Sequence, residues 1–177
     1  DGGTVINDDH SEPDDSRNSE ESSVGKENRQ LWTQLIETLQ LDDSGQEVPA
    51  PNASSNLYFF IPAPRNGGLV KDNWITVYLY RRTKTVGLFF TGTRNGYGGE
   101  VAREIAEDFD DVLAELGANT TINEPAPGKI NIGESRSFDQ LDEPQHRLEI
   151  VNWLSERINT YVNVFRPRVE AAAEKIG

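Results

Sequence analysis

The chain has 177 residues and carries 30 acidic against 17 basic side chains, which gives a net charge of −13 at pH 7. Cysteine is absent, which excludes disulfides and thiolate metal sites, and no apolar run reaches the roughly 18 to 20 residues that a membrane-spanning helix needs. Methionine is also absent and the sequence begins at Asp1, so we expect a piece of a longer cytoplasmic protein.

The first 26 residues are polar and acidic, with serines between the carboxylates. They hold too few apolar side chains to offset the chain entropy that folding would remove. The sequence therefore predicts a flexible linker or tail over residues 1–26. A single domain is predicted over residues 27–177, a length that suffices for one hydrophobic core.

A first helix is predicted over Lys26–Leu41. Leu31, Leu35 and Leu39 recur at a spacing of four, so they form one apolar stripe that must pack against another element. The polar run 42–45 ends this pattern and contains a glycine, which is typical of a helix stop.

Three short runs rich in β-branched and aromatic residues follow, and they read as strands over residues 57–61, 74–80 and 85–91. In the second run Ile75, Val77 and Leu79 alternate with three aromatic residues and a threonine. Because side chains alternate between the two faces of a strand, we expect the aliphatic set to face the helices.

Two more helical patterns lie in the second half of the chain. One is predicted over residues 99–116, with a glycine directly after it as its stop. The other begins near Pro144 and continues almost to the end, and Pro167 is expected to kink or divide it. Short extended segments over residues 120–123 and 129–132 lie between these helices.

The order of elements is therefore α-β-β-β-α-β-α. It predicts an α+β fold in which three main helices pack on an antiparallel sheet of three to five strands. The glycine-rich loop 92–99 precedes a helix and invites comparison with a phosphate-binding loop. Glu100 and Glu104 in the first turn would repel an anion, so we interpret the loop as a flexible connection.

Only five of the 17 basic residues are lysines, and the acidic excess is large. This composition is typical of proteins from organisms with a salt-loaded cytoplasm, where a Debye length of about 3 Å at 1 M salt screens repulsion among carboxylates. If the chain is halophilic, dilution should destabilise it. Thermal melts from low to molar potassium chloride test this, and a melting temperature independent of salt would contradict it.

From Arg29 to its end the chain resembles an uncharacterised prokaryotic domain-of-unknown-function family. The resemblance rests on residues 31–35, 75–80, 109–117 and 164–168. It implies a C-terminal domain of longer proteins, some of which carry nuclease-like modules. It implies no catalytic residues.

The order of elements, α-β-β-β-α-β, is similar to that of the restriction-endonuclease core, and the likeness lies in this order alone. That chemistry requires an acid at the second strand and an acid and a lysine on the third, to hold a divalent metal. Asp72 could supply the first acid, but residues 85–91 contain neither an acid nor a lysine. We therefore predict no catalytic residue, no metal site and no cofactor, although a degenerate nuclease-like scaffold that still binds nucleic acid stays open.

Basic residues concentrate between residues 61 and 97. This segment has a net charge of +5, so the rest of the chain carries −18. Cations interleaved with aromatic side chains could bind a nucleic acid through phosphate contacts and stacking, or they could pair with the protein's own acidic helices or with another chain. The predicted contact residues are Arg81, Arg82 and Lys84 at a hairpin tip, with Arg94, Arg65, Tyr80 and Tyr97.

These observations lead us to expect a non-catalytic accessory or interaction domain, within a protein that handles DNA or acts in defence. Its partner could be a protein, a sister copy or a nucleic acid, and no membrane contact is expected. A degenerate endonuclease-like domain with a basic DNA-binding hairpin is the alternative.

Overall fold

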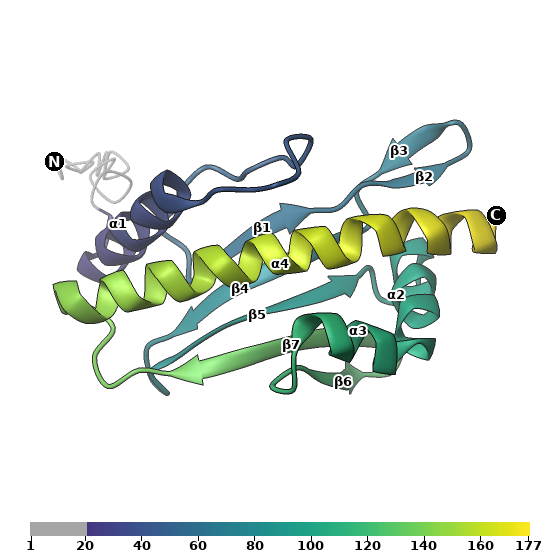
Figure 1. Cartoon of the computed structure of the whole chain (residues 1–177). Coiled ribbons are helices and arrows are strands. Elements are labelled where there is room, and N and C mark those ends of the chain that lie inside the picture. Colours follow the sequence, from purple (N-terminus) through teal and green to yellow (C-terminus); the bar gives the residue numbers. More distant parts are fainter. Residues whose placement is uncertain (1–20) are drawn as a thin grey trace, which may run out of the picture.

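A computed structural model describes residues 21–177, and it confirms an α+β fold (Figure 1). Five antiparallel strands form one sheet in the order β1-β4-β5-β7-β6, and β2 pairs with β3 in a separate hairpin. In chain order the elements are α1 (Ser23–Thr38), β1 (Asn56–Phe60), β2 (Ala63–Arg65), β3 (Gly68–Val70), β4 (Asn73–Tyr80), β5 (Thr85–Gly92), α2 (Tyr97–Glu107), α3 (Phe109–Leu116), β6 (Thr121–Ala126), β7 (Lys129–Ser137) and α4 (Pro144–Ile176).

Helix α4 crosses one side of the sheet, with α1 beside its first half and α3 beside its second half (Figure 1). The side chains of Ile75, Val77 and Leu79 on β4 are at most 1 % exposed, so this set faces the helices as predicted. At the centre of the core the ring of Phe90 on β5 stacks on Phe165 of α4, with centroids 4.2 Å apart and planes 7° apart. None of the helices in residues 21–177 has the length and apolar character needed to cross a bilayer.

Helix α1 begins earlier than predicted. The hydroxyl of Ser22 accepts a hydrogen bond from the amide of Gly25 at 3.0 Å and so caps the helix start. The boundary of the predicted linker at residue 26 is therefore too late, and most of that linker, residues 1–20, lies outside the described part of the chain. The helix also ends at Thr38, three residues before the predicted end.

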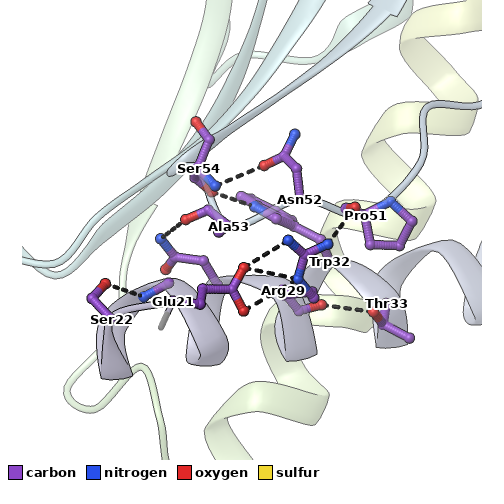
Figure 2. A network of polar contacts seen from close by, with 11 residues as sticks. Glu21, Ser22, Arg29, Trp32, Thr33, Pro51, Asn52, Ala53 and Ser54 are labelled. Carbon is purple, nitrogen blue, oxygen red and sulfur yellow. Dashed lines mark hydrogen bonds and ion pairs between the residues drawn. The ribbon is translucent and has the colours of Figure 1, made fainter. Parts of the chain in front are cut away.

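Side chains of α1 bind the segment that leads into β1 (Figure 2). The indole nitrogen of Trp32 donates to the carbonyl of Ser54 at 2.7 Å, and the amide of Asn28 donates to Ala53 at 3.0 Å. Because Trp32 is fully buried, these bonds fix the helix against the edge of the sheet at β1.

The predicted single helix over residues 99–116 is wrong, because two helices occupy this region. Asp108 leaves the helical conformation between them (φ −100°, ψ 37°) and separates α2 from α3. The break lets Ile105 on α2 and Val112 on α3 both bury their side chains although the two helices run in different directions. Gly117 ends α3 with φ 106°, as its position predicted.

Pro167 does not divide the last helix, which runs without interruption from Pro144 to Ile176. A proline removes one backbone donor and leaves the carbonyl four residues earlier without its partner. Pro167 and Asn163 are both exposed, so water can satisfy that carbonyl on the outer face of α4. The buried face keeps its packing through Val164 and Phe165.

The hairpin of β2 and β3 was not expected from the sequence. Its turn consists of Asn66 and Gly67, with φ angles of 52° and 79°. Two positive φ angles define a type I′ turn, which Asn-Gly forms readily and which closes a two-residue hairpin.

The loop 92–99 is held tightly, so interpreting it as a flexible connection is wrong. The buried amide of Asn73 donates to the carbonyls of Thr91 and Gly98, at 3.3 and 2.9 Å. A Cβ atom at Gly92 or Gly98 would overlap neighbouring backbone. These glycines therefore allow the start of α2 to approach the ends of β4 and β5.

Asp42 joins the loop after α1 to helix α4. Its carboxylate accepts hydrogen bonds from Asn159 at 3.0 Å and from Asn163 at 2.9 Å, and these bonds lower the pKa of Asp42 below its ordinary value of 3.8. A lowered pKa in the folded state adds stability above the ordinary pKa, and that stability disappears as the pH falls through the folded-state pKa.

We therefore expect acid to reduce the melting temperature of the natural chain more steeply than that of the Asp42→Asn variant, below about pH 4. The asparagine of the variant retains an acceptor oxygen but carries no titrating charge. The difference between the two proteins therefore reports the contribution of the ionised carboxylate. Melts at pH 7, 4, 3 and 2 measure the difference. Parallel curves for the two proteins would show that Asp42 does not contribute.

Candidate interaction surface

The side of the sheet that faces away from α1, α3 and α4 is covered by no helix of the described chain. We call it the open face. One row of paired residues crosses all five strands on this side, because side chains directly opposite in adjacent strands point the same way. The row consists of Tyr58, Thr76, Phe89, Gly133 and Thr121.

Aromatic side chains dominate the half of the open face that β1 and β4 form. Tyr58, Phe60 and Tyr80 are 43, 37 and 51 % exposed, which is high for aromatic residues in a sheet. The full aromatic set on this face is Tyr58, Phe60, Trp74, Tyr78, Tyr80 and Phe89.

The ring of Tyr78 lies across a glycine of the neighbouring strand, because a Cβ atom at Gly87 would meet its ring and hydroxyl. A Cβ atom at Gly133 would meet the carbonyl oxygen of Leu88 and the Cβ atom of Phe89. The ring of Tyr78 is 4.7 Å from that of Tyr80 and 5.8 Å from that of Phe89, measured between centroids. Tyr78, Tyr80 and Phe89 therefore form one aromatic cluster, and Phe60 and Trp74, 6.3 Å apart, form a second on the same face. We call these two clusters with Tyr58 the aromatic layer. Burial raises the pKa of Tyr78.

The other half of the open face, on β7 and β6, is polar and hollowed. A cavity of about 240 Å³ lies beside Tyr78 and Phe89, and it is lined further by asparagine, threonine and serine side chains. The Oδ1 atom of Asn131 in its wall is buried and accepts no hydrogen bond from the described residues. This half therefore offers space and hydrogen-bonding groups next to the aromatic layer.

The charge of the open face differs from that of the whole protein. In the strands as described, no aspartate or glutamate occupies a position that the pairing places on this side. Lys129 lies on it, with Nζ 4.8 Å from the centroid of Trp74, and burial lowers the pKa of Lys129. Lys71 lies at its margin, with Nζ 5.9 Å from the centroid of Phe60 and 2.6 Å from a carboxylate oxygen of Glu47.

The predicted contact residues do not form one patch. The hairpin tip with Arg81, Arg82 and Lys84 lies at one end of β4, and Arg94 lies near the other, about 25 Å away for a strand of eight residues. Of the aromatic residues predicted to bind, Tyr80 lies on the open face. Tyr97 is only 8 % exposed, and its ring lies under the guanidinium of Arg65 at 4.5 Å, so stacking on Tyr97 by a ligand is not supported.

Arg81 has intramolecular partners, which is the alternative that the sequence left open, and its role as an external contact stays a prediction. Its guanidinium lies 2.6 Å from the carboxylate of Asp142 and 3.6 Å from that of Glu27, and it donates to Asn28 at 2.9 Å. Arg81 thus joins the hairpin tip to α1 and to the loop before α4. Arg82 and Lys84 are exposed and form no ion pair with a described residue.

Arg81→Ala should therefore lower the free energy of unfolding by about 1 kcal/mol, because it removes a hydrogen bond to Asn28 and a partly exposed ion pair. Arg82→Ala, at the adjacent exposed position, should change it by less than about 0.5 kcal/mol. Urea denaturation of both variants measures this. Equal losses would contradict the assignment of Arg81 as a structural residue.

A partly buried ion pair was missed in the sequence. Glu134 on β7 faces the helices, and its Oε1 lies 2.5 Å from the guanidinium of Arg157 and 3.4 Å from the hydroxyl of Tyr161. Arg157 also donates to the carbonyl of Leu116, so the group connects α4, β7 and α3. Burial raises the pKa of Tyr161. We interpret this group as structural because its polar atoms bind one another.

Among residues 21–177 no three acidic or histidine side chains gather to hold a metal ion. Asp72 precedes β4, and β5 carries no acid or lysine beside it, so the described strands lack the endonuclease constellation.

Comparisons of the chain with protein-family models, with curated proteins and with solved structures find no match. The resemblance to an uncharacterised prokaryotic family stays a prediction. What the chain does is therefore inferred from the open face itself.

Proposed function

We propose that this chain is a non-catalytic interaction domain that binds another macromolecule through the open face. The observation that carries the proposal is an exposed aromatic layer without carboxylates in a protein of net charge −13. Contact surfaces are enriched in tyrosine, tryptophan and phenylalanine at their centres and depleted in acidic residues, which matches this composition.

The open face does not contribute to the core that holds the fold. The core lies between the sheet and α4, where Phe59, Ile75 and Phe90 are fully buried. Large exposed apolar patches on soluble proteins mark sites of association. Tyr58, Phe60 and Tyr80 keep aromatic surface in water, so we assign them to binding rather than to stability.

The alternative, nucleic-acid binding through the basic hairpin, has less support. Its central arginine is occupied within the molecule, and two exposed cations remain at the tip. A polyanion site needs cations along the path of the phosphates. The open face instead offers Lys129 on its surface and Lys71 at its margin, both at the same end.

Site-specific photo-crosslinking in the producing cell tests the proposal. A photoreactive phenylalanine analogue replaces Tyr58 on the open face, and in a matched control it replaces Leu148, which is 51 % exposed on the helical side. We expect Tyr58 to give an adduct of higher mass and Leu148 to give none.

Two outcomes would contradict the proposal. One is the absence of an intermolecular adduct from Tyr58, which includes an adduct confined within one chain, and the other is adducts of equal yield from both positions. The mass of the adduct identifies whether the bound molecule is protein or nucleic acid.

A further inference from the structure

We infer that the macromolecule bound to the open face is a second copy of this chain, so that two sheets pack face to face with their helices outside. This inference rests on the proposed function, since it names the partner of the same surface. Charge, area and shape each support it.

Charge limits where two copies can meet. Each copy carries −13, and outside residues 61–97 the chain carries −18. Like charges that face each other across an interface cost several kcal/mol. The strand pairing places no carboxylate on the open face, while Glu124 lies in the bulge of β6 and Glu47 lies at the margin beside Lys71. Two copies can therefore approach across β4, β5 and β7 without opposing acidic side chains.

The area of the open face is close to what a stable dimer requires. Five strands of five to nine residues, spaced about 4.8 Å apart with a rise of about 3.3 Å per residue, give a flat footprint of about 600 Å². A typical stable interface buries about 800 Å² of accessible surface on each partner. The accessible area is larger than the flat footprint, because side chains project from the sheet. An interface of typical size therefore requires the whole open face and not only a part of it.

The shape of the open face is self-complementary. Consider a two-fold axis that runs parallel to the strands, midway between the two sheets and above β5. It places β1 of one copy over β6 of the other. The protruding Tyr58 and Phe60 then lie over the hollowed half that contains Asn131, and the same contact repeats on the other side of the axis. Sheets packed in this way lie about 10 Å apart.

The salt dependence of binding distinguishes this dimer from a complex with a polyanion. At 0.1 M salt the Debye length is about 10 Å, and at 1 M it is about 3 Å, so salt screens the repulsion between two acidic copies. The dimer should therefore become tighter in molar potassium chloride. Binding of a nucleic acid would become weaker, because salt opposes the release of counterions from phosphates.

Sedimentation velocity of the full chain, over a dilution series in 0.2 M and 2 M potassium chloride, tests the inference. We expect a species of twice the 19.8 kDa chain mass, tighter at the higher salt. Ser135→Asp, at an exposed position of β7 on the open face, should weaken the dimer at least about tenfold, as should Tyr58→Asp. Leu148→Asp on the helical side is the matched control and should leave it unchanged.

Engineered cysteines test the geometry without disturbing buried residues, and the natural chain has no cysteine that could interfere. Tyr58 and Thr121 are exposed at opposite ends of one cross-strand row. A short bismaleimide linker should join a Tyr58→Cys copy to a Thr121→Cys copy. It should not join two Leu148→Cys copies.

A monomer at both salt concentrations, or dimerisation unaffected by Ser135→Asp and Tyr58→Asp in variants that melt like the natural chain, would overturn the inference. If the chain is monomeric while Tyr58 still gives a photo-adduct of another mass, the second copy is wrong and the proposed function stands. If the chain is monomeric and no adduct forms, both are wrong.

Discussion

Replacement of Phe165 by alanine is expected to lower the free energy of unfolding by about 4 kcal/mol. Phe165 is fully buried on α4, its ring stacks on Phe90 of β5 at 4.2 Å, and Tyr161 lies 5.7 Å away on the same helix. The substitution removes these ring contacts and leaves a cavity between helix and sheet, which the rigid sheet cannot fill.

Urea denaturation followed by circular dichroism measures this loss. Leu148→Ala serves as the control, because Leu148 lies on the same helix but is 51 % exposed, and it should cost less than about 1 kcal/mol. A Phe165→Ala variant as stable as this control would show that α4 is not anchored to the sheet at this point.

The second large effect is expected at Gly98, where alanine should cost about 3 kcal/mol. Its added Cβ atom would overlap the backbone carbonyl of Asp72, and Asn73 holds the Gly98 carbonyl at 2.9 Å, so neither side can move freely. The change should separate the start of α2 from the ends of β4 and β5.

Gly68→Ala is the matched control, since the nearest atom to a Cβ there is the Arg65 carbonyl oxygen at 3.9 Å. Thermal melts of both variants decide the matter. A Gly98→Ala chain that melts together with Gly68→Ala would contradict the tight packing of loop 92–99.

The fold class could be predicted because the hydrophobic period of the chain matches its structure. The alternation of Ile75, Val77 and Leu79 identified the buried side of β4, and the apolar spacing identified α4. Local patterns, however, do not determine where a helix must bend. The break at Asp108 lets α2 pack on β5 and β7 while α3 packs on α4, and Pro167 is accommodated because it lies on the solvent side of α4.

The candidate surface could not be found from the sequence in the same way. Local charge density favoured Arg81, but the partners of Arg81 are Asp142 and Glu27, which are distant in the sequence. The alternation along β4 did indicate that Trp74, Tyr78 and Tyr80 point away from the helices. The strand order and register place Tyr58 and Phe89 on the same face as these β4 residues, and the sequence alone did not provide that order or register.

The most direct measurement of the central claim is hydroxyl-radical footprinting of side chains inside the producing cell, compared with dilute purified protein. If the open face binds a macromolecule, Tyr58, Phe60 and Tyr80 should be oxidised less in the cell, while exposed Leu69 and Leu148 should be oxidised equally in both states. Equal oxidation of Tyr58, Phe60 and Tyr80 in both states would contradict the claim that the open face is the interaction surface.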